Sequence, residues 1–459
     1  MKNHLLGAAI ILIACSGSFA AEWKAAAAKT IITPTEPMVL SGFANREVPA
    51  EGTAMDLYAK SLAIEDTAGT RFVMVTLDLV EVTSQLRDAV AAETLAKFGL
   101  PAEALQLNCS HTHCGPELRY TELEFMSFTD PQRKDRCLRY NASLTEKIVG
   151  IIGESLQQLE PATISYSHAR CGFAMNRRLK SDHPTGDPYL NSPNPEGVVD
   201  HDVPVLTVTD AENHLKAVVF GYACHNTSMN IKQWHGDYAG HAQQMIEEAH
   251  PGTIALFMMG CGGDQNAYPR FSPLFSSRHG QSLATAVEAA IDAKPKPVKG
   301  PLAIRWQTTR ITYQSIPTAA EIEKRLTTGE GYDPSYEKYL RQWDEKRLYA
   351  IKNGGLREHY DYPVQIVRFG NDLTFVALSG ETCVDYSLRL KQEFEGPGAL
   401  WVAGYSNDVL AYIPSKRVLQ EGGYEALRAM MYWSNPLHPS AFADTIEGSI
   451  IDKVHEMLK

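Results

Sequence analysis

The sequence predicts a single large domain of the α/β class, with central mixed β-sheets covered by α-helices. Patterns typical of helices and strands alternate along the whole chain. Some strand connections are as short as hairpins and others pass through a helix, which favours a mixed sheet, or two sheets, covered by helices. No repeat of roughly 20–50 residues is visible, so a solenoid or a propeller is not predicted.

The first part of the chain predicts two strands, each followed by a helix. Phe72–Asp78 is a continuous apolar and β-branched run, which is typical of a buried strand. Ser84–Phe98 has helical spacing and is closed by Gly99. Leu105–Cys109 predicts the next strand. Ser143–Leu159 predicts a helix, because a serine and a glutamate at capping-box spacing open an apolar repeat of helical period.

The middle of the chain predicts three strands and two helices after a long loop. Ser181–Gly197 is rich in turn residues, and a loop of that length is usually functional or disordered. Two apolar strands separated by a polar turn come next, followed by a helix, a strand and a helix. In chain order these elements are Val203–Val208, Ala217–Tyr222, Ala239–His250, Thr253–Met258 and Ser282–Ala293.

The last part of the chain predicts a polar surface helix and a hairpin. Asp333–Ala350 has Pro334 at its first position, where a helix tolerates proline. Val364–Phe369 and Leu373–Leu378 flank a Gly-Asn-Asp turn, which predicts a hairpin. A further strand and a final helix are predicted at Ala399–Ala403 and Ala443–Leu458.

Composition narrows the class of partner. The chain has 459 residues, 44% of them hydrophobic, and a net charge of −11. Nucleic-acid binding depends on neutralising phosphates, so an acidic chain of this kind is a poor candidate for it. No run after the N-terminus approaches the roughly 20 apolar residues of a spanning helix. We therefore expect no nucleic-acid partner and no transmembrane helix in the mature chain.

The N-terminal residues 1–20 have the pattern of a secretory signal peptide. An apolar stretch, Leu5–Ala14, follows a lysine, and Ser18–Ala20 places small residues at the positions a signal peptidase requires. Leu12–Cys15 also resembles a bacterial lipobox, which would make Cys15 a lipid-modified N-terminus. We expect an exported, periplasmic or secreted protein cleaved near Ala20, with a lipoprotein anchored through Cys15 as the alternative.

The cysteines do not predict a disulfide framework. Of eight cysteines, seven remain if Cys15 is removed, and an odd number in an exported chain argues against complete pairing. No CxxC pair favours a zinc ribbon. We expect small buried apolar residues, with metal ligation or one disulfide as alternatives.

The strongest chemical signal is the segment Ser110–Pro116, which reads SHTHCGP directly after a predicted strand. Side chains alternate along a strand, so His111 and His113 point to the same face. Neutral imidazole is a common metal ligand, and two close histidines can divide into one ligand and one acid–base group. The alternative is a pair of hydrogen-bonded structural histidines.

Four further strands end in polar side chains. They carry His225, then Asp264 in a glycine-rich turn, then Glu381, and finally a segment that runs on to Tyr412. A phosphate-binding loop is not supported, because no lysine follows the glycines. Residues so far apart must converge to form one site. Together they predict a metal hydrolase within one large catalytic domain, although the length alone favours about three domains.

At these motifs the chain resembles the neutral/alkaline (non-lysosomal) ceramidase family in its N-terminal catalytic domain, from about Ala26 to Lys459. Ser110–Pro116 is similar to that family's SHTHSGP segment, and His225–Asn230 resembles its HGTSMN segment. The remaining similar segments, in chain order, are Ile32–Pro34, Ser41–Asn45, Asn176-Arg177, Gly380-Glu381, and Tyr412 with Tyr424 and Glu425. Their combination in this order is specific, although each segment alone is not.

The resemblance implies one zinc ion per chain, Zn²⁺ bound by His111, His225, Glu381 and Tyr412. It implies that His113 is a general acid/base beside the metal. Zinc lowers the pKa of a bound water to about 7, which would make hydroxide available at neutral pH.

The resemblance also implies the reaction. Arg177 and Tyr424 would contact the substrate carbonyl or the developing oxyanion, where each donor is worth about 3 kcal/mol. The implied activity is that of a zinc-dependent amidohydrolase, which cleaves a linear N-acyl (amide) bond with zinc-activated water. The implied substrate is a small-molecule or lipid N-acyl compound, as in sphingolipid metabolism.

The chain departs from the family at two points. Asn266 stands where ceramidases have a serine associated with catalysis; asparagine is no nucleophile, but it can hydrogen-bond a substrate. Ceramidases also carry a C-terminal immunoglobulin-like domain, which we expect to be absent because this chain stops after Ala443–Leu458. The resemblance therefore implies zinc hydrolysis more directly than it implies ceramide as the substrate.

Two alternative functions stay open. A zinc-dependent esterase, lactonase or phosphoesterase would keep the metal and change the bond that is cleaved. A non-catalytic ligand-binding relative would keep the scaffold without turnover, with Asn266 as the mark of decay.

Overall fold

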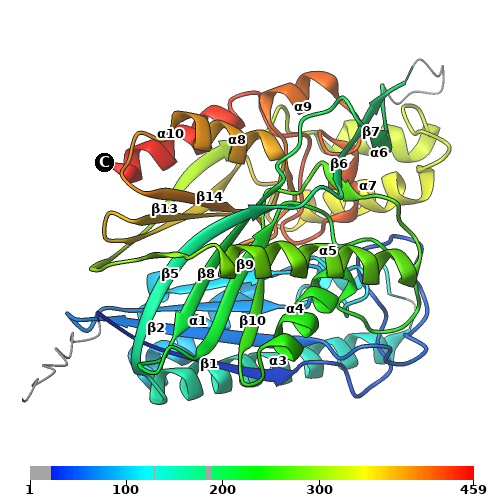
Figure 1. Cartoon of the computed structure of the whole chain (residues 1–459). Coiled ribbons are helices and arrows are strands. Elements are labelled where there is room, and N and C mark those ends of the chain that lie inside the picture. The colour runs from blue at the N-terminus through cyan, green and yellow to red at the C-terminus, as the bar shows by residue number, and fades with distance from the viewer. Residues whose placement is uncertain (1–21, 129, 182–187) are drawn as a thin grey trace, which may run out of the picture.

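The computed structural model describes residues 22–128, 130–181 and 188–459 (Figure 1). The predicted signal peptide, residues 1–20, and Cys15 lie outside the described residues. In the described part of the chain, no helix is both long enough and apolar enough to cross a membrane.

A large mixed sheet organises the N-terminal half of the chain. Its strands are β1 (Trp23–Ile31), β2 (Tyr58–Asp66), β3 (Arg71–Leu77), β4 (Leu105–Cys109), β5 (Glu160–Arg170), β8 (Asp202–Thr209), β9 (Leu215–Tyr222), β10 (Ile254–Met259) and β12 (Lys296–Pro297). They follow the order β10-β9-β8-β5-β1-β2-β3-β4, and β12 pairs with β5. The pairs β3–β4 and β9–β10 are parallel and the others antiparallel, so the predicted mixed sheet is confirmed.

A second mixed sheet and two small ones complete the strands. The second sheet, in spatial order, consists of β13 (Leu302–Thr312), β14 (His359–Phe369), β15 (Leu373–Leu378) and β17 (Ala399–Ala403). The small sheets consist of β11 (Gln265–Ala267) with β6 (Ala174–Lys180) and β7 (Tyr189–Asn194), and of β16 (Glu381–Thr382) with β18 (Tyr412–Ile413). The predicted hairpin is formed by β14 and β15, which pair antiparallel.

Ten α-helices lie against these sheets in the described residues. They are α1 (Ser84–Phe98), α2 (Glu122–Phe125), α3 (Pro131–Gln157), α4 (Asp237–Ala249), α5 (Pro273–Asp292), α6 (Ala319–Thr328), α7 (Glu337–Lys352), α8 (Val384–Glu393), α9 (Lys416–Glu421) and α10 (Ile446–Leu458). Two 3₁₀ turns lie at Ala102–Ala104 and Arg428–Tyr432. The predicted α/β class is confirmed.

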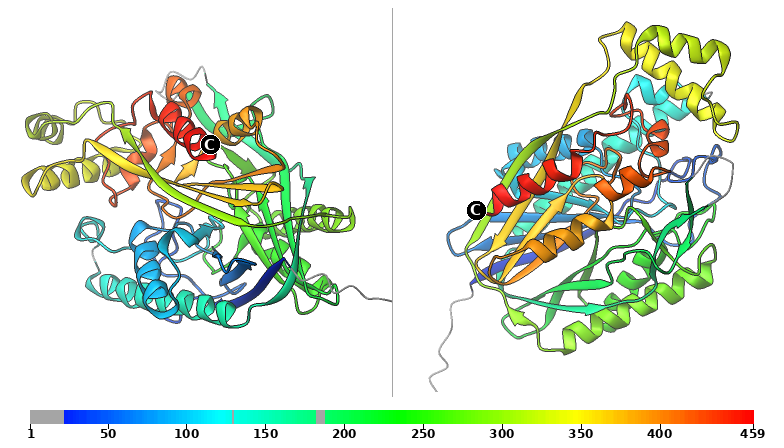
Figure 2. Two further views of the ribbon diagram at one scale, coloured as in Figure 1. Left: turned by 90° about the vertical axis from the view of Figure 1, so that its left-hand side faces the viewer. Right: turned by 90° about the horizontal axis from the view of Figure 1, so that it is seen from above.

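The layers follow from the alternation of side chains along each strand. On β3, Val73 and Val75 pack into a core with α1, α3, α4 and α5, whereas Phe72 and Met74 face the second sheet. A third core lies between the second sheet and helices α8 and α10. The molecule is therefore a helix–sheet–sheet–helix arrangement, visible in the left view of Figure 2.

Three predicted helix starts are wrong. The helix predicted from Ser143 begins at Pro131, after the N-cap Asp130, because its first turns are polar and carry little apolar periodicity. The helix predicted from Ser282 begins at Pro273 behind the cap Ser272. The helix predicted from Asp333 begins only at Glu337, so Pro334 lies in the preceding turn and not at the first helical position.

Two smaller predictions also need correction. The segment predicted as a long loop, Ser181–Gly197, contains strand β7, whose polar sequence has no strand-like apolar alternation. The final helix begins at Ile446 and not at Ala443.

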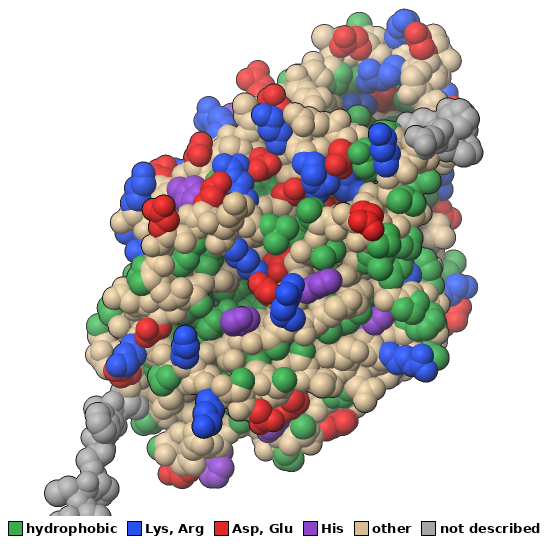
Figure 3. All heavy atoms as spheres, turned by 45° about the horizontal axis from the view of Figure 1, so that its top comes forward, with side chains coloured by type: hydrophobic (Ala, Val, Ile, Leu, Met, Phe, Trp, Pro, Cys, Tyr) green, Lys and Arg blue, Asp and Glu red, His purple; other side chains and the backbone are tan. Residues whose placement is uncertain are grey.

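The seven cysteines of the described residues are buried and unpaired. This confirms the prediction of small buried residues and contradicts the alternative of a disulfide among these seven. On the face shown in Figure 3, acidic and basic side chains are interspersed, and hydrophobic side chains form small groups.

Helices α6 and α7 project from one end of the molecule and depend on one buried carboxylate (Figure 2). Asp344 is fully buried and accepts hydrogen bonds from Arg325 (3.0 and 2.9 Å), from the Tyr332 hydroxyl (2.6 Å) and from Arg347. Burial alone would raise the pKa of Asp344, but these donors, Arg325 first, hold it below its usual value.

We expect Asp344→Asn to destabilise the chain by about 3–5 kcal/mol, because it leaves the buried Arg347 and the half-buried Arg325 without their charge partner. Because the pKa of Asp344 is lower in the folded state than in the unfolded state, its ionised carboxylate stabilises the fold above the unfolded pKa of about 4. This stabilisation is lost as the pH falls through the folded pKa. The difference between wild type and variant should therefore be largest above about pH 4 and shrink below it. Urea unfolding at several pH values measures this, with the exposed neighbour Glu345→Gln as control. Equal stability of Asp344→Asn and wild type at neutral pH would contradict it.

Candidate metal centre and active site

The predicted ligands come from strand ends of both large sheets. His111 follows β4 and His225 follows β9 in the large sheet. Glu381 follows β15 of the second sheet and pairs directly with Tyr412, because β16 and β18 run parallel with these residues in register. All four side chains are buried, so the structure brings the predicted set together.

The polar atoms of these residues meet at one point. Glu381 Oε2 lies 3.3 Å from His111 Nε2 and 3.2 Å from His225 Nε2. The Tyr412 hydroxyl lies 3.1 Å from His225 Nε2. His113 Nε2 lies 3.1 Å from His111 Nε2, and the three histidines form a buried group whose spacing could hold a metal ion.

The hydrogen bonds behind the histidines fix which nitrogen faces the centre. His111 Nδ1 lies 2.7 Å from the carbonyl oxygen of Val80, and His225 Nδ1 lies 2.7 Å from that of Gly262. A carbonyl oxygen only accepts, so both Nδ1 atoms carry the proton and both Nε2 atoms present lone pairs. Carbonyl partners of this kind are typical of the outer shell of a metal site.

The centre therefore consists mainly of acceptors. Burial, and next the charge of Arg177, lower the pKa of His225 to about 3, so its imidazole is neutral at pH 7. Burial alone would raise the pKa of Glu381, but His111 and His225 hold it well below its usual value. The Nε2 lone pairs of His111 and His225 both face the Glu381 carboxylate. Because all three groups are electron-rich, a cation between them would be stabilising. Imidazole, carboxylate and phenol oxygen are accepted zinc ligands, so the residues present fit that ion.

His113 lies at the edge of the centre, beneath the loop that carries Phe43. The Phe43 ring packs edge-on against the imidazole with centroids 4.7 Å apart, and a side chain at Gly42 would clash with it. His113 Nδ1 is buried and has no hydrogen-bond partner in the described residues. Burial, followed by the charges of His111 and His225, keeps the pKa of His113 well below its usual value. A neutral imidazole with a free nitrogen can accept a proton.

Arg177 connects the centre to a buried ion-pair cluster. Its Nη2 donates to the Tyr412 hydroxyl at 3.0 Å, and its Nη1 lies 3.4 Å from Asn266 Oδ1. Its Nε donates to Glu425 at 2.8 Å, and Glu425 also accepts from Arg178. Both arginines reach the same carboxylate although they are neighbours on β6, where the register with β7 shifts. Glu425 thus fixes the orientation of the Arg177 guanidinium group.

The structure also places the two remaining predicted residues. Asn266 is fully buried, bridges to the backbone of His225 and donates to Asn191 at 3.0 Å. The Tyr424 ring lies against Tyr412, with centroids 5.5 Å apart, and its hydroxyl makes no hydrogen bond to the described residues. Burial raises the pKa of the Tyr424 hydroxyl, so it remains a proton donor at neutral pH. All eight predicted site residues therefore lie in one cluster.

Sequence reasoning missed three contributors. Tyr405 packs its ring on His111 and donates to Glu381 Oε2 at 3.3 Å. Glu425 was part of the matching segment, but no role followed from the pattern. Arg46 donates to the His113 carbonyl and so ties the covering loop to the site. One signal could have indicated Tyr405. The segment Gly404–Asp408, which reads GYSND, directly follows the predicted strand Ala399–Ala403.

The predicted aspartate at the third strand end does not face the centre. Asp264 accepts from the Val384 amide at 2.8 Å and from Arg417 at 3.0 Å. It holds the glycine-rich turn against α8, so its role in this structure is to support the backbone of β11.

The chain is similar to known proteins over most of its length. A family model described as neutral/alkaline non-lysosomal ceramidase, N-terminal, matches residues 26–268, which is more than half of the chain. That segment contains His111, His113, Arg177, His225 and Asn266, whereas Glu381, Tyr412 and Tyr424 lie beyond it. A search of curated proteins finds no match.

Two solved structures share the fold. Neutral ceramidase from Pseudomonas aeruginosa superposes with a TM-score of 0.70 at 18% identity, covering 95% of this chain and 73% of that one. A structure described as ceramidase complexed with C2 has the same TM-score and identity, covering 95% of this chain and 76% of that one. At this identity the likeness supports the architecture, including the second sheet that lies outside the family match.

Proposed function

Because the chain belongs to the neutral/alkaline non-lysosomal ceramidase family, we propose that it is an exported zinc-dependent hydrolase that cleaves an N-acyl amide bond. Its catalytic domain extends over residues 26–459, and its substrate is a small molecule or a lipid. Export is inferred from the signal-type pattern of residues 1–20.

One observation supports this proposal most directly. His111 and His225 present lone pairs to a buried carboxylate, and their Nδ1 protons are already used behind the rings. In this proposal His111, His225, Glu381 and Tyr412 hold one zinc ion. When bound, zinc supplies Lewis acidity, which polarises an amide carbonyl and makes water a better nucleophile at neutral pH.

The chain's own residues supply the remaining steps. The Arg177 guanidinium and the Tyr424 hydroxyl donate to the oxygen of the substrate carbonyl, whose negative charge grows as water attacks. His113 is neutral and takes a proton from the attacking water. It then returns that proton to the departing amine nitrogen. The buried position of these groups strengthens each interaction, because little water competes with them.

The experiment that tests the proposal combines metal analysis with a substrate panel. Purified protein should contain about one zinc ion per chain and should hydrolyse short- or long-chain N-acyl amides. Faster hydrolysis of esters, lactones or phosphoesters would favour the second enzymatic candidate. Zinc or ligand binding without turnover of any substrate would favour a non-catalytic relative. These two candidates remain open because Asn266 stands at the position where ceramidases have a serine.

We expect Asn266→Ala to lower kcat about tenfold with little change in KM. The variant loses the contacts of Asn266 with Arg177 and Asn191, and one hydrogen bond of about 1.4 kcal/mol corresponds to a tenfold change. Asn266→Ser keeps an oxygen at this position and should lose less. Steady-state kinetics on one N-acyl substrate measures both. If Asn266→Ala matches wild type, Asn266 does not orient Arg177.

A further inference from the structure

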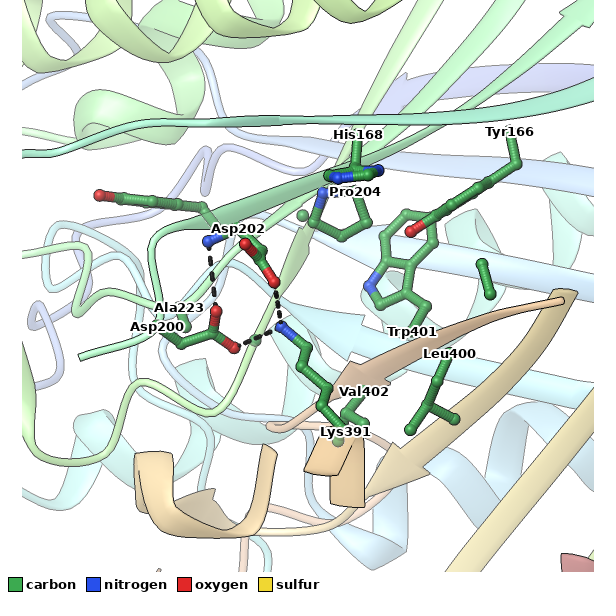
Figure 4. Close-up of a pocket in the computed structure, with 14 residues that line it drawn as sticks. Tyr166, His168, Asp200, Asp202, Pro204, Ala223, Lys391, Leu400, Trp401 and Val402 are labelled. Atoms are coloured by element: carbon green, nitrogen blue, oxygen red, sulfur yellow. Dashed lines mark hydrogen bonds and ion pairs between the residues drawn. The ribbon is translucent and has the colours of Figure 1, made fainter. Parts of the chain in front are cut away.

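A second cavity lies apart from the metal centre, where the two large sheets meet. It has a volume of about 200 Å³ and is lined by strands β5, β8, β9 and β17 and by α8 (Figure 4). Tyr166 and Trp401 form its aromatic wall, with ring centroids 6.4 Å apart. The proposed hydrolysis makes no use of this cavity.

The charges around the cavity are balanced. Lys391 Nζ lies 2.7 Å from Asp200 Oδ2 and 2.8 Å from Asp202 Oδ2, and Arg170 lies 3.9 Å from the other oxygen of Asp202. Two carboxylates thus face two cations, as the dashed contacts to Lys391 in Figure 4 show in part. A charged ligand would enter without a counter-charge, so the cavity suits a neutral one.

Several polar groups at the cavity lack partners. Trp401 is only 2% exposed, yet its indole N–H makes no hydrogen bond to the described residues and points into the cavity (Figure 4). The hydroxyl of the half-buried Tyr166 and the imidazole of the exposed His168 also have no hydrogen bond within the described part of the chain. Water reaches these groups in the cavity, and a ligand with suitable oxygens can replace that water. This cavity therefore presents donors and aromatic surface to a molecule that carries several oxygens.

Size restricts that molecule further. A cavity of about 150 Å³ can bind benzene, so about 200 Å³ has room for a ring of similar size. That space suits one six-membered ring, and a longer ligand would extend out of the open side of the cavity. The hydroxyl groups of a sugar ring can both donate to Asp202 and accept from Trp401. Its C–H face suits the electron-rich face of an aromatic ring.

We propose that this cavity is a binding site for a neutral pyranose, recognised by Trp401, Tyr166, His168 and the Lys391–Asp202 pair. The same chemistry is offered by a free monosaccharide and by the sugar headgroup of a glycolipid. The site is independent of the proposed hydrolysis.

Calorimetric titration and ligand-observed NMR test the proposal with the methyl glycosides of glucose, galactose and mannose. At least one should bind saturably with a millimolar dissociation constant. Trp401→Phe removes the N–H and keeps an aromatic ring, and it should weaken binding at least fivefold. Trp306→Phe, on β13 beside Arg87, is the matched control and should bind like wild type.

Further measurements distinguish a free monosaccharide from a lipid-linked sugar as the ligand. Octyl glucoside, kept below its micelle concentration, should bind like the methyl glycoside if a free sugar is recognised and more tightly if a lipid-linked sugar is. Tyr166→Phe, which loses only one oxygen, carries the test if Trp401→Phe does not fold. The proposal is overturned if no glycoside binds saturably, if folded Trp401→Phe or Tyr166→Phe binds like wild type, or if acetate or methylammonium binds more tightly than every glycoside.

Discussion

Replacing His225 by alanine should reduce the zinc content from about one ion per chain to near zero and lower hydrolysis at least about 1,000-fold. His225 contacts Glu381 at 3.2 Å and Tyr412 at 3.1 Å, so its loss removes a ligand and disperses two others. Metal-ion catalysis is worth several kcal/mol of transition-state stabilisation, and about 4 kcal/mol corresponds to three decades in rate.

Elemental analysis by mass spectrometry and steady-state hydrolysis of one N-acyl substrate measure the two effects of His225→Ala. His214→Ala is the matched control, because the His214 side chain is 75% exposed and, among the residues that the structure describes, pairs with Asp210 alone. That control should keep both metal and activity. A folded His225→Ala protein with full zinc content and wild-type rate would rule out the proposed centre.

Replacing Arg177 by methionine should lower kcat about 100- to 1,000-fold, the usual effect of removing one oxyanion donor. Arg177 is buried and donates to the Tyr412 hydroxyl at 3.0 Å, so its guanidinium faces the reacting groups. Arg177→Lys keeps the charge but loses the planar fork, and it should recover only part of the rate.

The neighbouring arginine offers a control that separates catalysis from stability. Arg178 is equally buried and also pairs with Glu425, but its other partners, Glu421, the Gly422 carbonyl and the Tyr189 ring, lie outside the predicted site residues. Arg178→Met should therefore destabilise the chain about as much as Arg177→Met while keeping kcat within about threefold of wild type. Thermal unfolding and kinetics of both variants decide the matter. Equal losses of kcat would show that Arg177 acts through folding alone.

The sequence predicted the elements that carry strong local signals. The buried strands Leu105–Cys109 and Leu373–Leu378 were predicted with the observed bounds. The first alternates apolar and polar residues, the second is mainly apolar, and each ends at a turn. The start of α3 was missed, because its first turns are exposed and polar and its cap Asp130 has no local apolar context. Strand β7 was missed for a similar reason, since polar strands are defined by their partners.

The candidate site also divides into residues with a local sequence signal and residues whose role depends on distant partners. His111 and His113 were recognisable because a close histidine pair directly after a predicted strand is a local signal. The expected alternation along that strand is wrong, because β4 ends at Cys109 and His111 has a positive φ of 58°. Glu425 was not assigned a role, because its meaning depends on Arg177 and Arg178, more than 240 positions away in the chain. Asp264 was placed at a strand end correctly, but no local pattern shows that its carboxylate turns toward Arg417.

The ligand set is divided between the two halves of the molecule. His111 and His225 end strands of the N-terminal sheet, while Glu381 and Tyr412 follow strands of the C-terminal one. An ion held by all four would link the two sheets, because each sheet would contribute two of its ligands. Free energy released on its binding would then contribute to their docking, so that loading the cofactor and completing the tertiary structure become one linked event.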